Sequence, residues 1–304
     1  MRYKCLTLSV IVICFLGILA QTIDAQEKGA GQINWMEGYI SAVGEGTAAP
    51  SGNKMKDQLR AVRAATIMAQ RALLETVKGV RIDSQTKVEN RMAQEDAIHT
   101  RIEGIIQGAE IVKQDVRWEG DTPIASVELR ICLGGLGVCR PEKSMINALT
   151  LDQKDEPPHV PPQRLNDIVV KQETLIQKVH GGVIYDSSKP VTGVIFNLQG
   201  LFFERQILPV VMTIDDGNKP FTVYSVKTVD PLTIRTYGVV RYADSVEQAK
   251  QNSYLGDNVM VVPVSGVTKE NMIVIGFDAA RIIRETTVHG NDYLKTAKVI
   301  IAAK

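Results

Sequence analysis

The chain has 304 residues, of which 44% are hydrophobic and 23% charged, and its formal net charge is +1. This length is sufficient for two domains with buried cores. A near-neutral chain without a block of like charges lacks the concentrated positive surface that nucleic-acid binding requires, so composition excludes nucleic acid as a partner.

Residues 1–25 follow the order of a secretory signal peptide. Arg2 and Lys4 precede an apolar run, and the small residues Ala20 and Ala25 follow it. The run is shorter than the roughly 20 apolar residues that a membrane span needs. We expect cleavage after Ala25, with Ala20 as the alternative, and export to the periplasm or outer membrane. Membrane contact is then indirect, or goes through an uncleaved signal anchor.

Lipidation is not expected, because Cys14 lies inside the apolar run and not at its end. Loss of the signal leaves Cys132 and Cys139, in the segment RICLGGLGVCRP. In an oxidising compartment these two are a disulfide candidate, and two buried thiols are the alternative. Two cysteines without a neighbouring histidine are too few ligands for structural zinc, so we predict no metal there.

The first predicted domain covers residues 35–141 and combines strands with helices. A strand begins near Trp35, a long amphipathic helix covers residues 54–79, and a strand-like alternation follows over residues 80–88. A polar helix and two antiparallel strands around EGDTP complete it. The first strand starts close to the mature terminus and ends in glycines. We therefore predict a free interaction edge there, with these candidate residues: Trp35, Tyr39, Ser41 and Val43.

A proline-rich linker with a bridging helix is predicted over residues 142–182, because DEPPHVPPQR resists packing into a regular element. The second predicted domain covers residues 183–304. Its segments alternate strands with short helices, and DPLTIRTYGVV is expected to be a strand. The fold class expected for the chain is α+β: two separately folding domains, each a mostly antiparallel sheet packed with helices.

Gly44, Gly46 and Ala49 fit the spacing of a dinucleotide-binding loop, G-x-G-x-x-A. Such a loop must open directly into a helix, whose first amides face the pyrophosphate. Here Pro50 and Gly52 intervene before the helical pattern begins, and the acidic residue expected about 20 positions later is missing. The pattern therefore indicates a glycine exit from an edge strand, and no cofactor is predicted.

Several segments together resemble the LPP20 domain of bacterial envelope proteins. These are GYISAVGEGTAAPS, QLRAVRAATIMAQRALLETVKGVRIDSQTKVEN, GIIQGAEIVKQDV and ASVELRICL. Runs in the second domain, such as GDNVMVVPVSGV, resemble the companion domain of longer members. The resemblance implies a non-enzymatic envelope protein, in some members tied to flagellar assembly or motility. It supplies no catalytic residues.

The titratable residues agree with a non-enzymatic protein. The four histidines are scattered along the chain, and Asp215-Asp216 lies in the turn composition DDGNK. We predict a structural or assembly component that binds other envelope proteins or itself. The alternative is a periplasmic module for a small ligand or a glycan. Glycan sites usually carry exposed aromatic side chains, whereas Trp35 and Trp118 lie in strand-like stretches.

Overall fold

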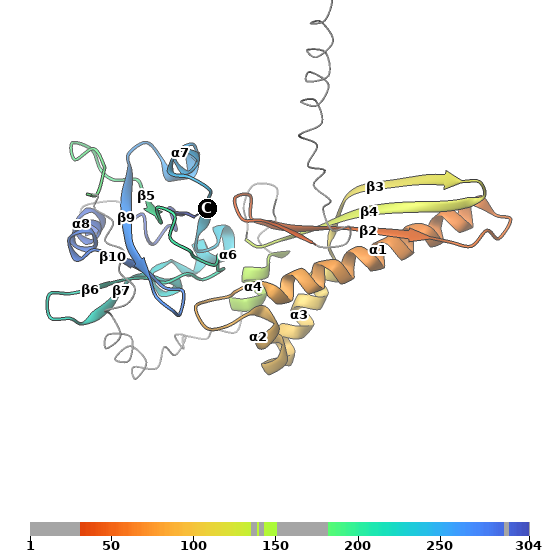
Figure 1. Cartoon of the computed structure of the whole chain (residues 1–304), viewed down its shortest axis with the longest axis horizontal. Coiled ribbons are helices and arrows are strands. Elements are labelled where there is room, and N and C mark those ends of the chain that lie inside the picture. Colours follow the sequence, from red (N-terminus) through yellow and green to blue (C-terminus); the bar gives the residue numbers. More distant parts are fainter. Residues whose placement is uncertain (1–30, 135–138, 140–142, 151–181, 289–291, 304) are drawn as a thin grey trace, which may run out of the picture.

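The computed structural model describes residues 31–134, 139, 143–150, 182–288 and 292–303. The helices and strands form two regions that lie side by side (Figure 1). Each region combines a sheet with helices, so the expected α+β class is confirmed. The predicted signal peptide and the predicted bridging helix lie outside the described residues. In the part of the chain that is described, no helix is both long and apolar enough to span a membrane.

The first region is built on an antiparallel sheet in the order β1-β2-β4-β3. Its strands are β1 (Gln32–Asn34), β2 (Tyr39–Thr47), β3 (Glu110–Glu119) and β4 (Thr122–Cys132). Helix α1 (Lys54–Gly79) runs along one face of the sheet, under β2 and β4 (Figure 1). The inward side chains of β4 alternate strictly with its outward ones, as expected for a sheet with one covered face.

Helix α1 starts where Asn53 accepts a hydrogen bond from the Lys56 amide, 3.1 Å away. In the first turn, hydrogen bonds from Ser51 hold the pKa of the Asp57 carboxyl below its usual range. The buried stripe of the helix repeats every fourth residue and is mostly alanine near the sheet: Ala61, Ala65, Ala69, Leu73 and Val77. These small side chains allow the helix and the sheet to approach closely.

Gly44 and Gly46 of β2 complete this close approach. A Cβ atom on Gly44 would lie 2.1 Å from the Ala65 carbonyl oxygen, and one on Gly46 would lie 2.3 Å from the Ala65 amide nitrogen. Both distances are too short for any real side chain. The G-x-G pattern therefore lies in the last part of β2, where both glycines contact the backbone of α1.

Beyond α1 the chain turns back through a short loop, and the strand expected over residues 80–88 is wrong. Arg81 and Lys87 form only a single bridge, because Asp83 accepts hydrogen bonds from the amides of Gln85 and Thr86 and closes a turn. The expected polar helix is divided into α2 (Val88–Gln94) and α3 (Asp96–Gln107). A further helix, α4 (Met145–Thr150), packs against α3 inside the stretch predicted as linker.

The second region contains a mixed sheet in the order β7-β6-β10-β9-β5-β11-β8. Its strands are β5 (Gly193–Asn197), β6 (Val211–Ile214), β7 (Pro220–Tyr224), β8 (Arg241–Ala243), β9 (Val259–Val267), β10 (Ile273–Ile275) and β11 (Val299–Ala302). Strand β5 lies between β9 and β11 and is parallel to both. Parallel pairs also join β11 to β8 and β10 to β6, so the expected mostly antiparallel pairing is wrong for this sheet. Strands β9 and β10 form an antiparallel hairpin.

The helices of this region are α6 (Pro231–Tyr237), α7 (Val246–Lys250) and α8 (Phe277–Val288). Helix α6 replaces the strand expected from DPLTIRTYGVV. Asp230 caps the helix by accepting hydrogen bonds from the Leu232 and Thr233 amides, and Pro231 occupies its first position. These signals outweigh the β-propensity of the segment. Ser245 caps α7 by accepting a hydrogen bond from the Gln248 amide.

The two regions share one apolar cluster. The Trp35 ring meets the Tyr242 ring edge-on, with 5.3 Å between centroids. Arg81 forms a parallel bridge with Gln206 and an ion pair with Glu204. The amides of Ile207 and Leu208 donate to the carbonyls of Arg81 and Ile82, at 3.0 and 2.6 Å. The junction is therefore both apolar and hydrogen-bonded.

Candidate interaction site at the open edge of the first sheet

The free edge predicted at residues 35–46 is only partly present. Trp35 lies in the turn before β2 and packs on Tyr242, so it belongs to the junction. Tyr39 and Ser41 are paired on both sides, with β1 and with β4. Only beyond Ser41, where β1 ends, is β2 an edge strand, and Val43 lies there with 45% of its surface exposed. The prediction is wrong for Tyr39 and Ser41 because β1 covers the start of β2, and it is wrong for Trp35 because its ring packs on Tyr242.

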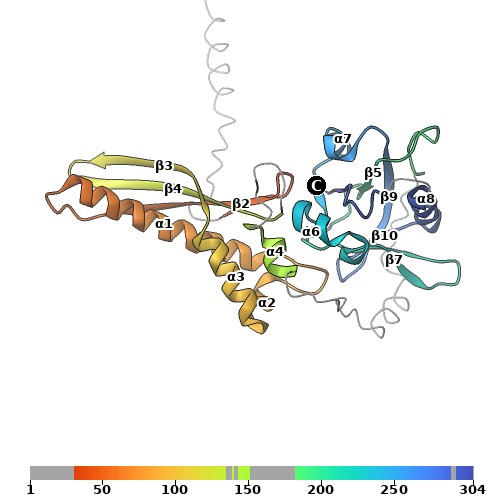
Figure 2. The same cartoon turned by 180° about the vertical axis from the view of Figure 1, so that it is seen from behind.

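The long open edge of this sheet is β3. Its ten residues pair with β4 on one side, and in the described part of the chain no element pairs with the other side. Both cartoon views show β3 as the outermost strand, and its hairpin with β4 points away from the second region (Figures 1 and 2). All residues of β3 except Val116 and Trp118 are exposed. An edge strand of this kind offers unpaired amides and carbonyls to another chain.

The face of the sheet opposite α1 carries charges along β3. Between the bulge and the hairpin, four charged residues of β3 pair with residues of β4 that point away from α1. These four are Lys113, Asp115, Arg117 and Glu119. Ion pairs join neighbours along the strand, with 3.2 Å between Lys113 and Asp115 and 3.8 Å between Arg117 and Glu119. These side chains are exposed, so the pairs contribute little to stability and are available to a partner. The alternating signs are visible in the sequence and are the signal that could have identified β3.

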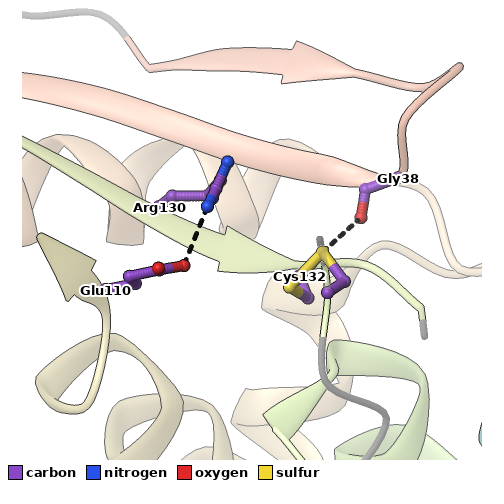
Figure 3. The surroundings of a disulfide bond; sticks show 5 residues. Gly38, Glu110, Arg130 and Cys132 are labelled. Atoms are coloured by element: carbon purple, nitrogen blue, oxygen red, sulfur yellow. Dashed lines mark hydrogen bonds and ion pairs between the residues drawn. A yellow bond between two sulfur atoms is a disulfide. The ribbon is translucent and has the colours of Figure 1, made fainter. Parts of the chain in front are cut away.

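The other end of the sheet is closed by a disulfide between Cys132 and Cys139, whose Cα atoms are 5.5 Å apart (Figure 3). The end of β4 is bound to the turn between β1 and β2, because the Leu133 amide donates a hydrogen bond to the Gly38 carbonyl at 2.7 Å. The Cys139 sulfur also lies 3.7 Å from that carbonyl oxygen. The disulfide thus holds the end of β4 against the start of β2.

A groove of about 690 Å³ lies beside the disulfide, between the end of α3, the start of β3 and α4. Its charged lining consists of Arg101, Glu110, Arg130 and Lys143. Arg130 donates to Glu110 at 2.9 Å, as Figure 3 shows, and its guanidinium lies 5.4 Å from the centre of the Tyr39 ring. The lining carries more positive than negative charge, so the groove favours an anionic group.

The second region contains a buried cation, Arg241. Arg241 is 4% exposed, and its guanidinium lies 3.5 Å from the centre of the Tyr254 ring. Burial lowers the pKa of this guanidinium. The aromatic ring compensates part of the charge, which is the structural role we assign to the pair.

Of the four histidines, His159, His180 and His289 lie outside the described residues. Among the described residues, no group of three or more His, Cys, Asp or Glu side chains is placed to hold a metal ion. Asp215 caps its own turn by accepting a hydrogen bond from the Lys219 amide at 2.7 Å. His99 lies on the exposed face of α3, 3.7 Å from Glu103.

The fold and the site together define a two-region α+β protein with an open sheet edge. A family model described as the second domain of Treponema pallidum Tp0624 matches residues 193–304. The match begins at β5 and covers the mixed sheet of the second region. No curated protein matches this chain.

Proposed function

We propose that this chain is a non-enzymatic, exported protein of the cell envelope, with a structural or assembly role that it performs by binding other proteins. More narrowly, we propose that the protein is associated with the flagellum. The signal-like N-terminus and the LPP20-like segments of the first region support the envelope setting.

The observation that carries this proposal is the open edge of β3. The strand is long and exposed, it projects on a hairpin away from the second region, and its backbone offers hydrogen bonds to another strand. Helix α1 packs against β2 and β4, with a close backbone contact at β2, and β3 is held to this base by its pairing with β4. Binding by strand addition needs this combination and no catalytic group.

Export is tested by fractionating cells that produce the full chain and measuring the intact mass of the mature protein by mass spectrometry. The expected result is an envelope protein that begins near Gln26 and carries no lipid. An acyl group on a cysteine would contradict the unlipidated form, and retention in the cytoplasm would contradict the proposal.

Binding is tested with a photo-cross-linking residue at position 115 on β3, in living cells. We expect cross-links to an envelope protein or to another copy of the chain. The matched control is position 45 on β2, which faces the same side of the sheet and is also exposed. Equal products from both positions would contradict a specific role of β3. A turnover lost on changing an Asp or a His would overturn the non-enzymatic function.

The groove beside the disulfide favours a second function, binding of a small anionic ligand in the periplasm. Arg130 and Lys143 supply positive charge there, and the groove is large enough for a small molecule. A thermal-shift screen of sugar phosphates and dicarboxylates tests this function. A ligand whose stabilisation is lost in Lys143→Gln would support it.

A further inference from the structure

We propose that β3 pairs with β3 of a second copy of this chain, antiparallel, about a twofold axis that passes through Val116. This inference rests on the proposed function of β3 as a contact site and names its partner. A symmetric pair of this kind joins the two sheets of the first regions into one.

The charges on the open face of β3 alternate in sign. Along the open face the residues are Lys113, Asp115, Arg117 and Glu119, so the signs run plus, minus, plus, minus. In an antiparallel pair centred on Val116, residue 113 lies opposite residue 119, and residue 115 lies opposite residue 117. Every charge of this set then faces an opposite charge in the other copy. Opposite charges directly across a strand pair stabilise it, and like charges destabilise it.

Neighbouring registers do not achieve this pairing. An axis through Asp115 places this carboxylate opposite its own copy and brings Lys113 opposite Arg117. An axis through Arg117 makes the same error with the signs exchanged, because Asp115 then faces Glu119. An axis through Gln114 pairs Lys113 with Asp115 but leaves Arg117 opposite Ile111. An axis through Trp118 pairs Arg117 with Glu119 but brings Asp115 opposite Asp121. Only the axis through Val116 places all four charges opposite a charge of the other sign.

The face toward α1 agrees with this register. Val116 and Trp118 pair with the inward residues Ala125 and Pro123 of β4, and both are half-buried at the edge. In the proposed pair, Val116 lies opposite Val116 at the centre, and Trp118 lies opposite Gln114. The apolar edge of each first region is thereby covered, while the charges remain on the solvent side.

The ends of β3 limit the pairing to residues 113–119. The register with β4 shifts between Ile111 and Lys113, which marks a bulge before the charged stretch. Gly120, with φ at +61°, turns the hairpin directly after Glu119. Lysines at strand edges often prevent association. Here each lysine and arginine has an acidic counterpart at the symmetric position, so this register is favoured, and like charges oppose the registers centred on Asp115 and Arg117.

Charge exchange tests the pairing in the purified protein produced from the full chain, by sedimentation over a range of concentrations. Asp115→Arg alone places arginine opposite Arg117, and Arg117→Asp alone places aspartate opposite Asp115. Each single variant should dissociate at about tenfold or more higher concentration than the wild type. An equal mixture of the two variants should recover association. At positions 115 and 117 one copy then carries two arginines and the other carries two aspartates, so each of these side chains faces an opposite charge. Glu45→Arg is the control on β2 and should associate like the wild type.

Cysteine cross-linking tests the register. Val116→Cys should form a disulfide between copies under mild oxidation, because strand partners at the axis lie within reach of a disulfide. Gln114→Cys is the matched control, since it faces the same side but lies opposite Trp118. Cross-linking of Gln114→Cys without that of Val116→Cys would overturn the register.

The result also separates this inference from the proposed function. A wild type that stays monomeric at all concentrations, with no recovery in the mixture, would overturn pairing between copies. If position 115 still cross-linked to another envelope protein, the contact function of β3 would stand and only the identity of its partner would change.

Discussion

Gly44 and Gly46 determine how closely β2 approaches α1. Their Cα atoms face the backbone of the helix and not its side chains, so the contact contains no flexible side chain that could move aside. Protein interiors are packed tightly enough that even one added methyl group is felt. The glycine pair that resembles a cofactor loop therefore has a packing role that the sequence pattern alone does not reveal.

Gly44→Ala should destabilise the protein by about 2 kcal/mol or more, because the new Cβ would lie 2.3 Å from the Ala69 amide nitrogen. Chemical denaturation followed by circular dichroism measures the change. Gly104→Ala is the control: nothing lies within 4 Å of its Cβ position, and it is inside α3. There the substitution should be neutral or stabilise by up to about 1 kcal/mol. Similar effects at both sites would contradict the close contact.

Buried tyrosines make the second region sensitive to alkali. Burial raises the pKa of Tyr224 and Tyr242, and it raises the pKa of Tyr293 to about 12. An unfolded tyrosine titrates near 10. The folded state therefore retains protons that the unfolded state releases, so this stability is complete below about pH 10 and is lost as the pH rises toward 12.

The free energy of unfolding, measured at several values between pH 8 and pH 11, should fall steeply above pH 10. Tyr293→Phe should fall less steeply, because one of the titrating groups is removed. The absorbance of tyrosinate at 295 nm gives an independent check. Titration of all tyrosines near pH 10 in the folded protein would contradict the raised pKa values.

At the scale of the elements, the disulfide between Cys132 and Cys139 supports the junction between the two regions. Leu133 and Gly134 line a cavity of about 30 Å³ between the two regions, together with Trp35 and Gln206. Closing so short a loop stabilises the folded state by about 2.5 kcal/mol in the chain-entropy model. The Cys132→Ser, Cys139→Ser double variant should lose about this amount in denaturant titrations. Reductant should lower the stability of the wild type and leave that of the double variant unchanged.

The elements that were predictable from sequence are those with local signals. Helix α1 has a continuous four-residue repeat with Asn53 at its start, and the β9–β10 hairpin has two apolar runs around a polar turn. The α+β class followed from such patterns. Helix α6 was missed because its aliphatic and aromatic residues favour a strand, although Asp230 and Pro231 are a helix start signal.

The candidate site was less predictable than the helices, because an edge is a property of the whole sheet. The hairpin of β3 and β4 was expected, but which of the strands stays unpaired depends on β1, which comes just before the predicted domain. Strand order in the second sheet has the same difficulty. β5 lies beside β9 and β11, which are distant in sequence, and local periodicity does not distinguish these partners.

For the whole molecule, the main consequence of the structure is that the two regions share one core. Trp35 of the first region packs on Tyr242 of the second, and Arg81 is bound to the segment around Gln206. The linker composition alone suggests separate folding. The shared cluster instead predicts that the regions support each other, and that the linker is not what holds them together.

Cleavage of the proline-rich stretch between residues 151 and 164 should therefore leave the two fragments associated. Linkers between folded regions are favoured sites of limited proteolysis, and native mass spectrometry of the nicked protein shows whether the fragments separate. Trp35→Ala removes the edge-to-face ring contact with Tyr242, so its nicked form should come apart at lower denaturant concentration. Trp118→Ala is the matched control, since Trp118 lies on β3 under Lys54 and away from the junction. Separation of the wild-type fragments without denaturant would show that the linker, and not the shared core, joins the regions.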